Sequence, residues 1–321
     1  MSTGAFEAVR ASTARVVQEA RAVRIDDERL DALATELAGE SFAPNDADPA
    51  QHRVGDDAST LAFVVTLDAI NFGSGYFPFL AKEPGRSGYL TIAQRVERRF
   101  RTAGPWSPTQ LEQLGSADCA ALLGQDLAVP EVAELMGLYA AAWNELGRFL
   151  NERHAGRFEP LVEAAAGSAD AFVRDLLRMP FYRDVADYAG FEVMFLKRAQ
   201  ISVADLCNAF AGDGLGRFAD IDDLTMFADN LVPHVLRCRG VLVYADDLAR
   251  RIDAGIRLAA GAAEEVEIRA AGLQAVERCV ARLRAKGVDV AARQVDAVLW
   301  SRGQRPEIKA RPRHRTRSVY Y

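Results

Sequence analysis

Apolar residues recur at helical spacing along almost the whole chain of 321 residues, with no regular alternation of strands and helices. In residues 5–23 one helical face is apolar except for Thr13, and it carries Phe6, Val9, Val16, Val17 and Ala20. Proline at the first helical position predicts helix starts at Pro108 and Pro130. The pattern predicts an all-α fold and argues against a doubly wound sheet.

The expected helices occupy most of the sequence. We predict them at 5–23, 26–39, 88–100, 107–115, 130–153, 158–165, 168–177, 180–188, 192–211, 221–228, 232–240, 245–254, 263–285 and 289–302. The apolar segment 59–71 fits a buried helix or a strand, and the polar segment 44–58 fits a loop. Without a fixed-period repeat or a low-complexity linker, we expect one compact helical domain over 1–321, with 1–58 as an N-terminal helical and loop segment within it.

Charge and cysteine content limit the class of protein. Half of the residues are hydrophobic, so a sizeable core can form, and a net charge of -6 argues against a general nucleic-acid binder. The four cysteines are far apart and form no CxxC pair, which predicts neither a zinc site nor a disulfide framework. Glu7 and Arg10 stand where a signal peptide needs apolar residues, and no stretch is long enough to span a membrane. We expect a soluble cytoplasmic protein without a metal.

The last nine residues combine cations with two terminal tyrosines. Arg313, His314, Arg315 and Arg317 precede Tyr320-Tyr321. Large aromatic side chains favour burial, so the tail is expected to dock onto the body of the protein. Its cations would then suit an anion, most simply a phosphate. The alternative is a solvated basic tail.

Residues 68–78 combine an apolar run with Asp68, Asn71 and a Gly-Ser-Gly turn set among aromatics. Such a turn permits close backbone approach to a ligand, and Phe72 and Tyr76 can stack on a flat ring. The alternative is a helix end followed by a tight loop. The glycine spacing matches neither a phosphate loop nor a dinucleotide fingerprint.

Two further segments place ionisable groups among apolar residues. Lys197 and Asp205 lie on one predicted helix, and Asp205 is flanked by apolar side chains, so it needs a partner. Glu267 lies between Val266 and Ile268 and is expected to face inward, while Arg269 cannot pair with it at i+2. A structural ion pair for Asp205 and a helical salt-bridge face for Glu267 are the alternatives.

Residues 218–233 hold two candidate catalytic carboxylates. Asp220 is a natural N-cap, and the acidic residues after it suit a helix N-terminus. Asp229 follows Phe227 at a helix junction before an extended pre-proline segment. A carboxylate there can act as a general base or stabilise a cation. Alternatively, Asp229 caps the helix that begins at Val232.

These motifs together resemble the queuosine salvage family. The matching stretches are LDAINFGSGYFP (67–78), MPFYRDVADY (179–188), LKRAQISVADL (196–206), GLGRFADIDDLTMFADNLVPHVLRCRGVLVY (214–244), EVEIRAAGLQAVE (265–277) and VLWSRGQRPEIKARPRHRTRSVYY (298–321). The Phe-Ala-Asp-X-X-Val-Pro core and the closing PRHRTRSVYY are specific to the family. Where the family pattern has Tyr-Arg after the aspartate, this chain has Asn230 and Leu231.

The resemblance implies an N-glycosidase that releases queuine from queuosine 5'-monophosphate, and a fold similar to helical DNA glycosylases. Catalysis centred on aspartate carries over to Asp220 and Asp229, which the sequence does not rank. The implied substrate-binding residues are Asn71, Phe72, Tyr76, Lys197, Asp205, Phe227, Glu267, Arg269, His314 and Arg315.

The residue types fit that reaction. Breaking an N-glycosidic bond develops positive charge on the ribose, which a carboxylate stabilises while taking a proton from water. Aromatic side chains can sandwich the flat base, another carboxylate can bind its amine, and Arg, Lys or His can bind the phosphate. No cofactor, nucleic acid or membrane partner is expected. The alternatives are a non-catalytic binding protein for a modified purine nucleotide and a DNA glycosylase, although the acidic composition argues against the latter.

Overall fold

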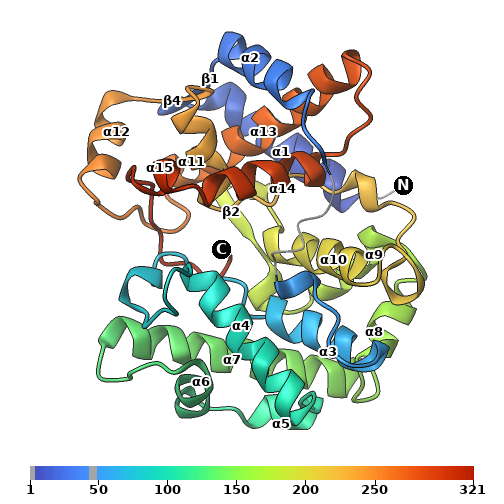
Figure 1. Ribbon diagram of the computed structural model, residues 1–321. Helices are drawn as coiled ribbons and strands as arrows, with labels where there is room; N and C mark the ends of the chain where they lie inside the picture. Colours follow the sequence, from blue (N-terminus) through green and yellow to red (C-terminus); the bar gives the residue numbers. More distant parts are fainter. Residues whose placement is uncertain (1–3, 43–48) are drawn as a thin grey trace. The chain divides into compact units, whose positions relative to one another are not determined.

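The computed structural model describes residues 4–42 and 49–321. Its elements run in the order α1 (Ala5–Glu19), β1 (Val23–Ile25), α2 (Asp27–Leu37), η1 (Pro49–Gln51), α3 (Asp57–Asp68), η2 (Phe77–Phe79), α4 (Gly88–Ala103), α5 (Pro108–Gln113), α6 (Ser116–Leu123), α7 (Pro130–Arg153), α8 (Glu159–Ala164), α9 (Ala169–Leu176), η3 (Pro180–Tyr182), β2 (Val185–Tyr188), β3 (Phe191–Met194), α10 (Lys197–Ala209), η4 (Gly214–Gly216), η5 (Ile221–Asp223), α11 (Leu231–Cys238), β4 (Leu242–Tyr244), α12 (Asp246–Asp253), α13 (Ala263–Ala285), α14 (Ala292–Gly303) and α15 (Pro306–Lys309) (Figure 1). The fold is mostly helical, as the sequence predicts.

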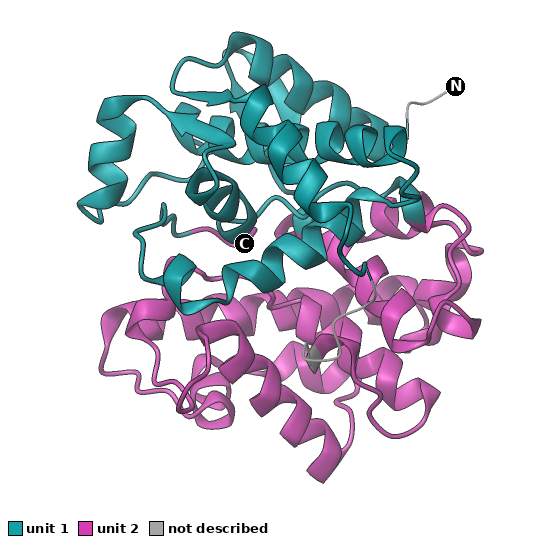
Figure 2. Cartoon of the chain, turned by 45° about the horizontal axis from the view of Figure 1, so that its top comes forward, with its two compact units in different colours: residues 1–45, 184–197, 222–317 teal, residues 46–183, 198–221, 318–321 magenta. Residues whose placement is uncertain are grey.

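Contacts within the chain divide it into two compact units (Figure 2). Unit 1 takes residues 1–45, 184–197 and 222–317, and unit 2 takes residues 46–183, 198–221 and 318–321. Both units therefore combine segments that are distant in sequence. The expected single domain over 1–321 stays a prediction.

Unit 1 is built around α13. This helix packs against α1, α2, α11 and α14, and residues 265–273 are buried on every side. Strand β1 pairs antiparallel with β4, with Val23 opposite Tyr244. The Thr13 hydroxyl, the polar interruption on α1, is buried: it donates to the Val9 carbonyl and accepts from the Gln274 side chain of α13. A buried polar group is tolerated here because its hydrogen bonds are made.

Unit 2 is built around the long helix α7, which packs against α5 and α6. Gly147 permits the close approach of α5, because a Cβ there would lie 2.8 Å from the Glu112 nitrogen. The segment 59–71, for which the sequence allows helix or strand, forms the buried helix α3. The Trp143 indole of α7 donates to the Thr66 carbonyl at 2.9 Å and so joins the two helices.

Four of the predicted helices are wrong in whole or in part. The segments 180–188 and 192–211 contain the hairpin β2–β3, followed by α10 only from residue 197. The two residues between the strands, Ala189 and Gly190, have positive φ of 50° and 84°, typical of a type I′ hairpin turn. The sequence pattern missed this turn because alanine there gives no signal for positive φ.

The segment 221–228 is also largely non-helical. Only η5 forms there, and the backbone from 224 to 229 is irregular although Leu224 and Met226 are buried. The Phe227 amide donates to the Asp296 carboxyl of α14 instead of to a helical carbonyl. A tertiary hydrogen bond therefore overrides local helical preference. Helix α1 likewise ends at Glu19, before the predicted residue 23, since β1 follows.

Candidate active site

Asp229 lies in unit 1 at the junction that leads into α11. Its Oδ1 accepts hydrogen bonds from the amides of Leu231 at 2.7 Å and Val232 at 3.1 Å. Asp229 therefore caps the first turn of α11 as the alternative predicts, although the helix begins at Leu231 and not at Val232. In the described part of the chain both hydrogen bonds of Asp229 end on Oδ1, so capping leaves Oδ2 for other chemistry. The side chain is half-buried, which keeps it accessible to a small ligand.

Asp296 of α14 is the second carboxyl of the site, and it is only 4% exposed. It accepts a hydrogen bond from the Phe227 amide at 3.1 Å. Burial raises the pKa of Asp296 well above its usual value, the charge of Asp229 raises it further, and the charge of Lys197 opposes this. The surroundings therefore favour the protonated form of Asp296. Two carboxyls in unlike environments are a common arrangement for acid–base catalysis.

Basic side chains of unit 1 surround this pair. Lys197 begins α10 and is 5% exposed. Burial lowers the pKa of Arg313 and the charge of Asp229 opposes that effect, so the guanidinium and this carboxylate interact. An arginine remains charged in proteins, and it can therefore bind an anion here.

His314 is buried beside these cations, whereas Arg315 is exposed. Burial, and after it the charge of Arg313, lower the pKa of His314 from 6.5 to about 3. The imidazole is therefore neutral at physiological pH. The backbone of this segment is fixed by the Leu258 amide, which donates to the Arg315 carbonyl at 3.0 Å.

Asn230 and Leu231, which follow Asp229, have internal contacts in unit 1. The Asn230 side chain donates to the His314 carbonyl at 3.4 Å. Leu231 packs on α14 where Gly303 leaves space, because a Cβ at that glycine would lie 2.7 Å from the leucine. Leu231 therefore makes an apolar packing contact within unit 1.

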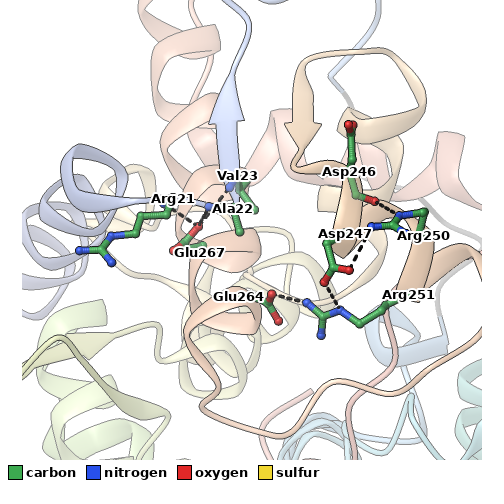
Figure 3. A network of polar contacts seen from close by, with 9 residues as sticks. All are labelled: Arg21, Ala22, Val23, Asp246, Asp247, Arg250, Arg251, Glu264 and Glu267. Carbon is green, nitrogen blue, oxygen red and sulfur yellow. Dashed lines mark hydrogen bonds and ion pairs between the residues drawn. The ribbon is translucent and has the colours of Figure 1, made fainter.

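Glu267 faces inward, as predicted. Its Oε2 accepts from the backbone amides of Arg21, Ala22 and Val23 at 2.7–3.2 Å (Figure 3). Its Oε1 accepts from the Tyr188 hydroxyl at 2.8 Å. The carboxylate thus satisfies the backbone amides between α1 and β1. The alternative, a helical salt-bridge face for Glu267, is wrong; Glu264, three residues earlier in α13, pairs with Arg251 of the neighbouring helix α12.

Arg269 is 2% exposed and has several internal partners in unit 1. It donates to both oxygens of Asp184, at 3.0 and 2.6 Å, and its Nε donates to the Ala228 carbonyl at 2.8 Å. Glu265 lies 3.7 Å away. Arg269 does not pair with Glu267 in these contacts, as the i+2 spacing predicts.

In unit 2 the aromatic loop 71–76 follows α3. Phe72 is buried against Tyr139, with ring centroids 5.1 Å apart, and against the Arg198 guanidinium at 4.8 Å. The Tyr76 hydroxyl donates to Glu134 at 2.8 Å. Asn71 is half-buried, and Asp205 of α10 is 6% exposed. These positions stay candidate ligand contacts.

Asp220 supports another helix of unit 2. Its carboxylate accepts from the Ser168 hydroxyl and from the amides of Ala169 and Asp170 at the start of α9. Burial alone would raise the pKa of Asp220, but these hydrogen bonds lower it below its usual value. The carboxylate therefore stabilises the N-terminus of α9. The sequence predicts a capping role for Asp220, but at the start of the segment that follows it and not at α9.

The end of the chain docks onto the Gly-Ser-Gly turn of unit 2. The Tyr321 carbonyl accepts from the amides of Gly73 at 3.0 Å and Ser74 at 3.4 Å, and Tyr321 is 3% exposed. Gly73 has a φ of 103°, which favours glycine. The docked tail is confirmed for Tyr321, whereas Tyr320 is only half-buried.

Sequence reasoning missed Asp184 and Asp296. Asp296 stands alone in the apolar run Val295-Asp-Ala-Val-Leu of α14, and an isolated carboxylate at such a place is a usable signal. Asp184 follows Arg183 in a polar-looking stretch, so nothing local distinguishes it from a surface residue. Its role depends on contacts with residues 85 positions away.

Within residues 4–42 and 49–321, every helix is too short or too polar to cross a lipid bilayer. His, Cys, Asp and Glu side chains in this part of the chain form no group of three or more suited to a metal ion.

The contacts define the class: a mostly helical protein with a site of two carboxyls in unlike environments, next to basic side chains. Within this class the chain belongs to the queuosine salvage protein family, whose model matches residues 51–321. A queuosine 5'-phosphate N-glycosylase/hydrolase of Sphaerobacter thermophilus is 36% identical over 315 residues, which cover 97% of this chain and 96% of that protein. Proteins of the same name from Mus musculus and Dictyostelium discoideum are 32% and 33% identical, covering 83% and 82% of this chain and 83% and 78% of those proteins.

Proposed function

We propose that this protein hydrolyses the N-glycosidic bond of queuosine 5'-phosphate and releases queuine for salvage into tRNA modification. Family membership and the names of the relatives supply the substrate. The observation in this chain that carries the proposal is the carboxyl pair of Asp229 and Asp296 with Lys197 and Arg313 around it.

Asp229 is the proposed catalytic carboxylate. As the bond from C1′ to the base nitrogen breaks, the electron pair leaves with the base and positive charge develops on the ribose. The free oxygen of Asp229 stabilises that charge and takes a proton from the attacking water. Asp296, favoured in its protonated form, supplies a proton to the departing base. The water oxygen bonds to C1′, the proton that water loses goes to Asp229, and the proton that the base gains comes from Asp296.

Asp220 is the weaker catalytic candidate of the two. Its two carboxylate oxygens already accept three hydrogen bonds at the start of α9. We therefore propose that Asp229, which uses one oxygen for capping, carries the reaction, and that Asp220 supports the fold.

Binding is assigned by chemistry. Arg313, Arg315 and Lys197 suit the 5'-phosphate, because charged hydrogen bonds to phosphate are strong. Phe227 of unit 1 is proposed to contact the flat base. Asn71, Phe72, Tyr76, Asp205, Glu267 and His314 remain further candidates from the sequence, whereas the guanidinium of Arg269 is held by Asp184 and the Ala228 carbonyl. The free nucleotide, and no nucleic acid, is the proposed partner. The likeness to helical DNA glycosylases and the cytoplasmic location also stay predictions.

The test is product formation. The purified protein is incubated with queuosine 5'-monophosphate, and queuine and ribose 5-phosphate are measured by liquid chromatography and mass spectrometry, with Asp229→Asn as control. We expect both products from the wild type in equal amounts. A nucleotide that binds and is recovered intact would instead establish the alternative, a non-catalytic binding protein.

A further inference from the structure

A buried ion pair of unit 1 connects the two segments that carry Lys197 and Asp229. Asp184 and Arg269 each have side chains 3% exposed, and their groups are joined by two hydrogen bonds of 3.0 and 2.6 Å. A two-point contact between a guanidinium and a carboxylate fixes orientation as well as distance. The pair is therefore suited to holding other groups in place.

Asp184 holds the turn before Lys197. Its carbonyl accepts from the amides of Phe195 at 3.0 Å and Leu196 at 3.3 Å, and its Oδ2 accepts from the Lys197 amide at 3.1 Å. Leu196 has a φ of 54°, a conformation that costs free energy for a residue with a Cβ. Such a backbone persists only where its surroundings enforce it, and here Asp184 supplies three hydrogen bonds.

Arg269 holds the segment before Asp229. Its Nε donates at 2.8 Å to the carbonyl of Ala228, the residue that precedes Asp229. The same guanidinium lies 3.9 Å from the ring centroid of Phe195, in the turn that Asp184 fixes. The guanidinium of Arg269 thus contacts both segments, because its planar group donates to Asp184 and to the Ala228 carbonyl at the same time.

We propose that Asp184 and Arg269 are positioning residues that set the placement of Lys197 relative to Asp229. This rests on the proposed function of the Asp229 site. Arg269 then acts through the backbone of Asp229 and not by contact with the substrate. Misplacing a catalytic group by about 1 Å can cost about 100-fold in rate.

The test compares three variants of the full chain. Arg269→Lys keeps the charge but cannot reach Asp184 with two donors and the Ala228 carbonyl at once. Asp184→Asn keeps an oxygen for the Lys197 amide but loses the charge. Glu265→Gln is the matched control: Glu265 is equally buried and lies 3.7 Å from Arg269, and its Oε2 accepts a hydrogen bond from the Gly261 amide.

For each variant kcat, KM and Tm are measured, with kinetics well below the lowest Tm. We expect Arg269→Lys and Asp184→Asn to lower kcat by about 100-fold with KM within about threefold of the wild type. Glu265→Gln should lower Tm but keep kcat within about threefold. The proposal is overturned if the two folded variants keep kcat, or if Glu265→Gln loses as much.

A double-mutant cycle gives a second readout. In an Asp229→Asn background, Arg269→Lys should reduce the residual rate by less than about threefold, since it acts through Asp229. A full, independent loss in that background would contradict the positioning role. If Arg269→Lys does not fold, Asp184→Asn is used instead, both for the single-variant kinetics and for the double-mutant cycle. An inactive wild type would reject the proposed function, whereas an active wild type with unaffected variants rejects only this inference.

Discussion

At the scale of single residues, Asp229 and Asp220 differ in how many of their carboxylate oxygens accept hydrogen bonds. Each accepts hydrogen bonds at a helix N-terminus, but Asp220 uses both oxygens and Asp229 uses one. A catalytic carboxylate needs an oxygen available to the reacting atoms. The number of occupied oxygens therefore separates two candidates that the motif leaves equal.

Asp229→Asn is expected to reduce base release by about 100-fold or more, because the charge beside the developing cation is lost. Its Tm should change little, since asparagine also caps helices. Asp220→Asn should retain base release but lose about 1–3 kcal/mol of stability, because an amide group has one acceptor oxygen and cannot keep all three hydrogen bonds at the start of α9. Steady-state kinetics and thermal melting of both variants decide between the two aspartates. Wild-type rates for both would reject the aspartate mechanism.

Asp296→Asn is expected to remove activity while raising stability at neutral and alkaline pH. The folded state binds the Asp296 proton more tightly than the unfolded state, whose pKa is near 3.8. The contribution of this group to the unfolding free energy is complete below that value and is lost as the pH rises through the raised pKa. Urea unfolding at about pH 5 and about pH 8 should show a variant advantage that grows with pH. An advantage that shrinks with pH would contradict this assignment.

His314 should make the opposite contribution. Its pKa falls from 6.5 to about 3 because it is buried, so between these values only the unfolded state binds the proton. The unfolding free energy should then decrease as the pH falls below about 6.5, by about 1.4 kcal/mol per pH unit for this group. His314→Gln should flatten that slope. NMR spectra in which the His314 imidazole of the folded protein titrates near pH 6.5 would contradict this prediction.

At the scale of elements, the tail is an internal part of both units and not a solvated end. Residues 313–317 belong to unit 1, where the Arg315 carbonyl and the His314 carbonyl accept hydrogen bonds. Residues 318–321 belong to unit 2, where Tyr321 docks on Gly73 and Ser74. Loss of the tail therefore removes packing contacts from the cores of both units.

Truncation after Arg311 is expected to destroy activity and lower Tm strongly, because removal of a buried aromatic alone costs about 3 kcal/mol or more. Arg315→Ala provides the matched milder change, since its side chain is exposed. For that variant we expect a raised KM and a normal Tm, which indicates contact with the ligand. A lowered Tm with unchanged KM would indicate a structural role instead. A truncated protein that remains folded and fully active would show that the docking is dispensable.

At the scale of the whole molecule, local charge matters more than net charge. The chain carries a net charge of -6. Even so, Lys197 and Arg313 lie near the carboxyl pair of unit 1, and Arg315 is two residues after Arg313. A basic site in a protein of net negative charge favours a small anion over a polyanion, whose extended charge the protein would repel. This distribution supports a nucleotide substrate.

The 5'-phosphate should accordingly be preferred over the bare nucleoside. Several cations on one anion strengthen binding and orient the ribose, so we expect kcat/KM to be higher by about tenfold or more. Parallel kinetics with queuosine and queuosine 5'-monophosphate measure the ratio. Arg313→Gln should lower it, and Arg24→Gln, an exposed arginine of β1, is the control. Equal efficiency for the two compounds would remove the proposed phosphate contact.

The sequence alone predicts the mostly helical class, the docked tail and the inward-facing Glu267, because apolar spacing and isolated charges are local features. It also determined the family, through the motifs around Phe227-Ala-Asp229 and the closing residues. Tertiary structure decided the irregular backbone at 224–229 and the β2–β3 hairpin, where long-range hydrogen bonds and a positive φ outweigh helical preference. It also brought Asp296 to Asp229 and Asp184 to Arg269. Those pairings join residues 67 and 85 positions apart, so only the folded chain could reveal them.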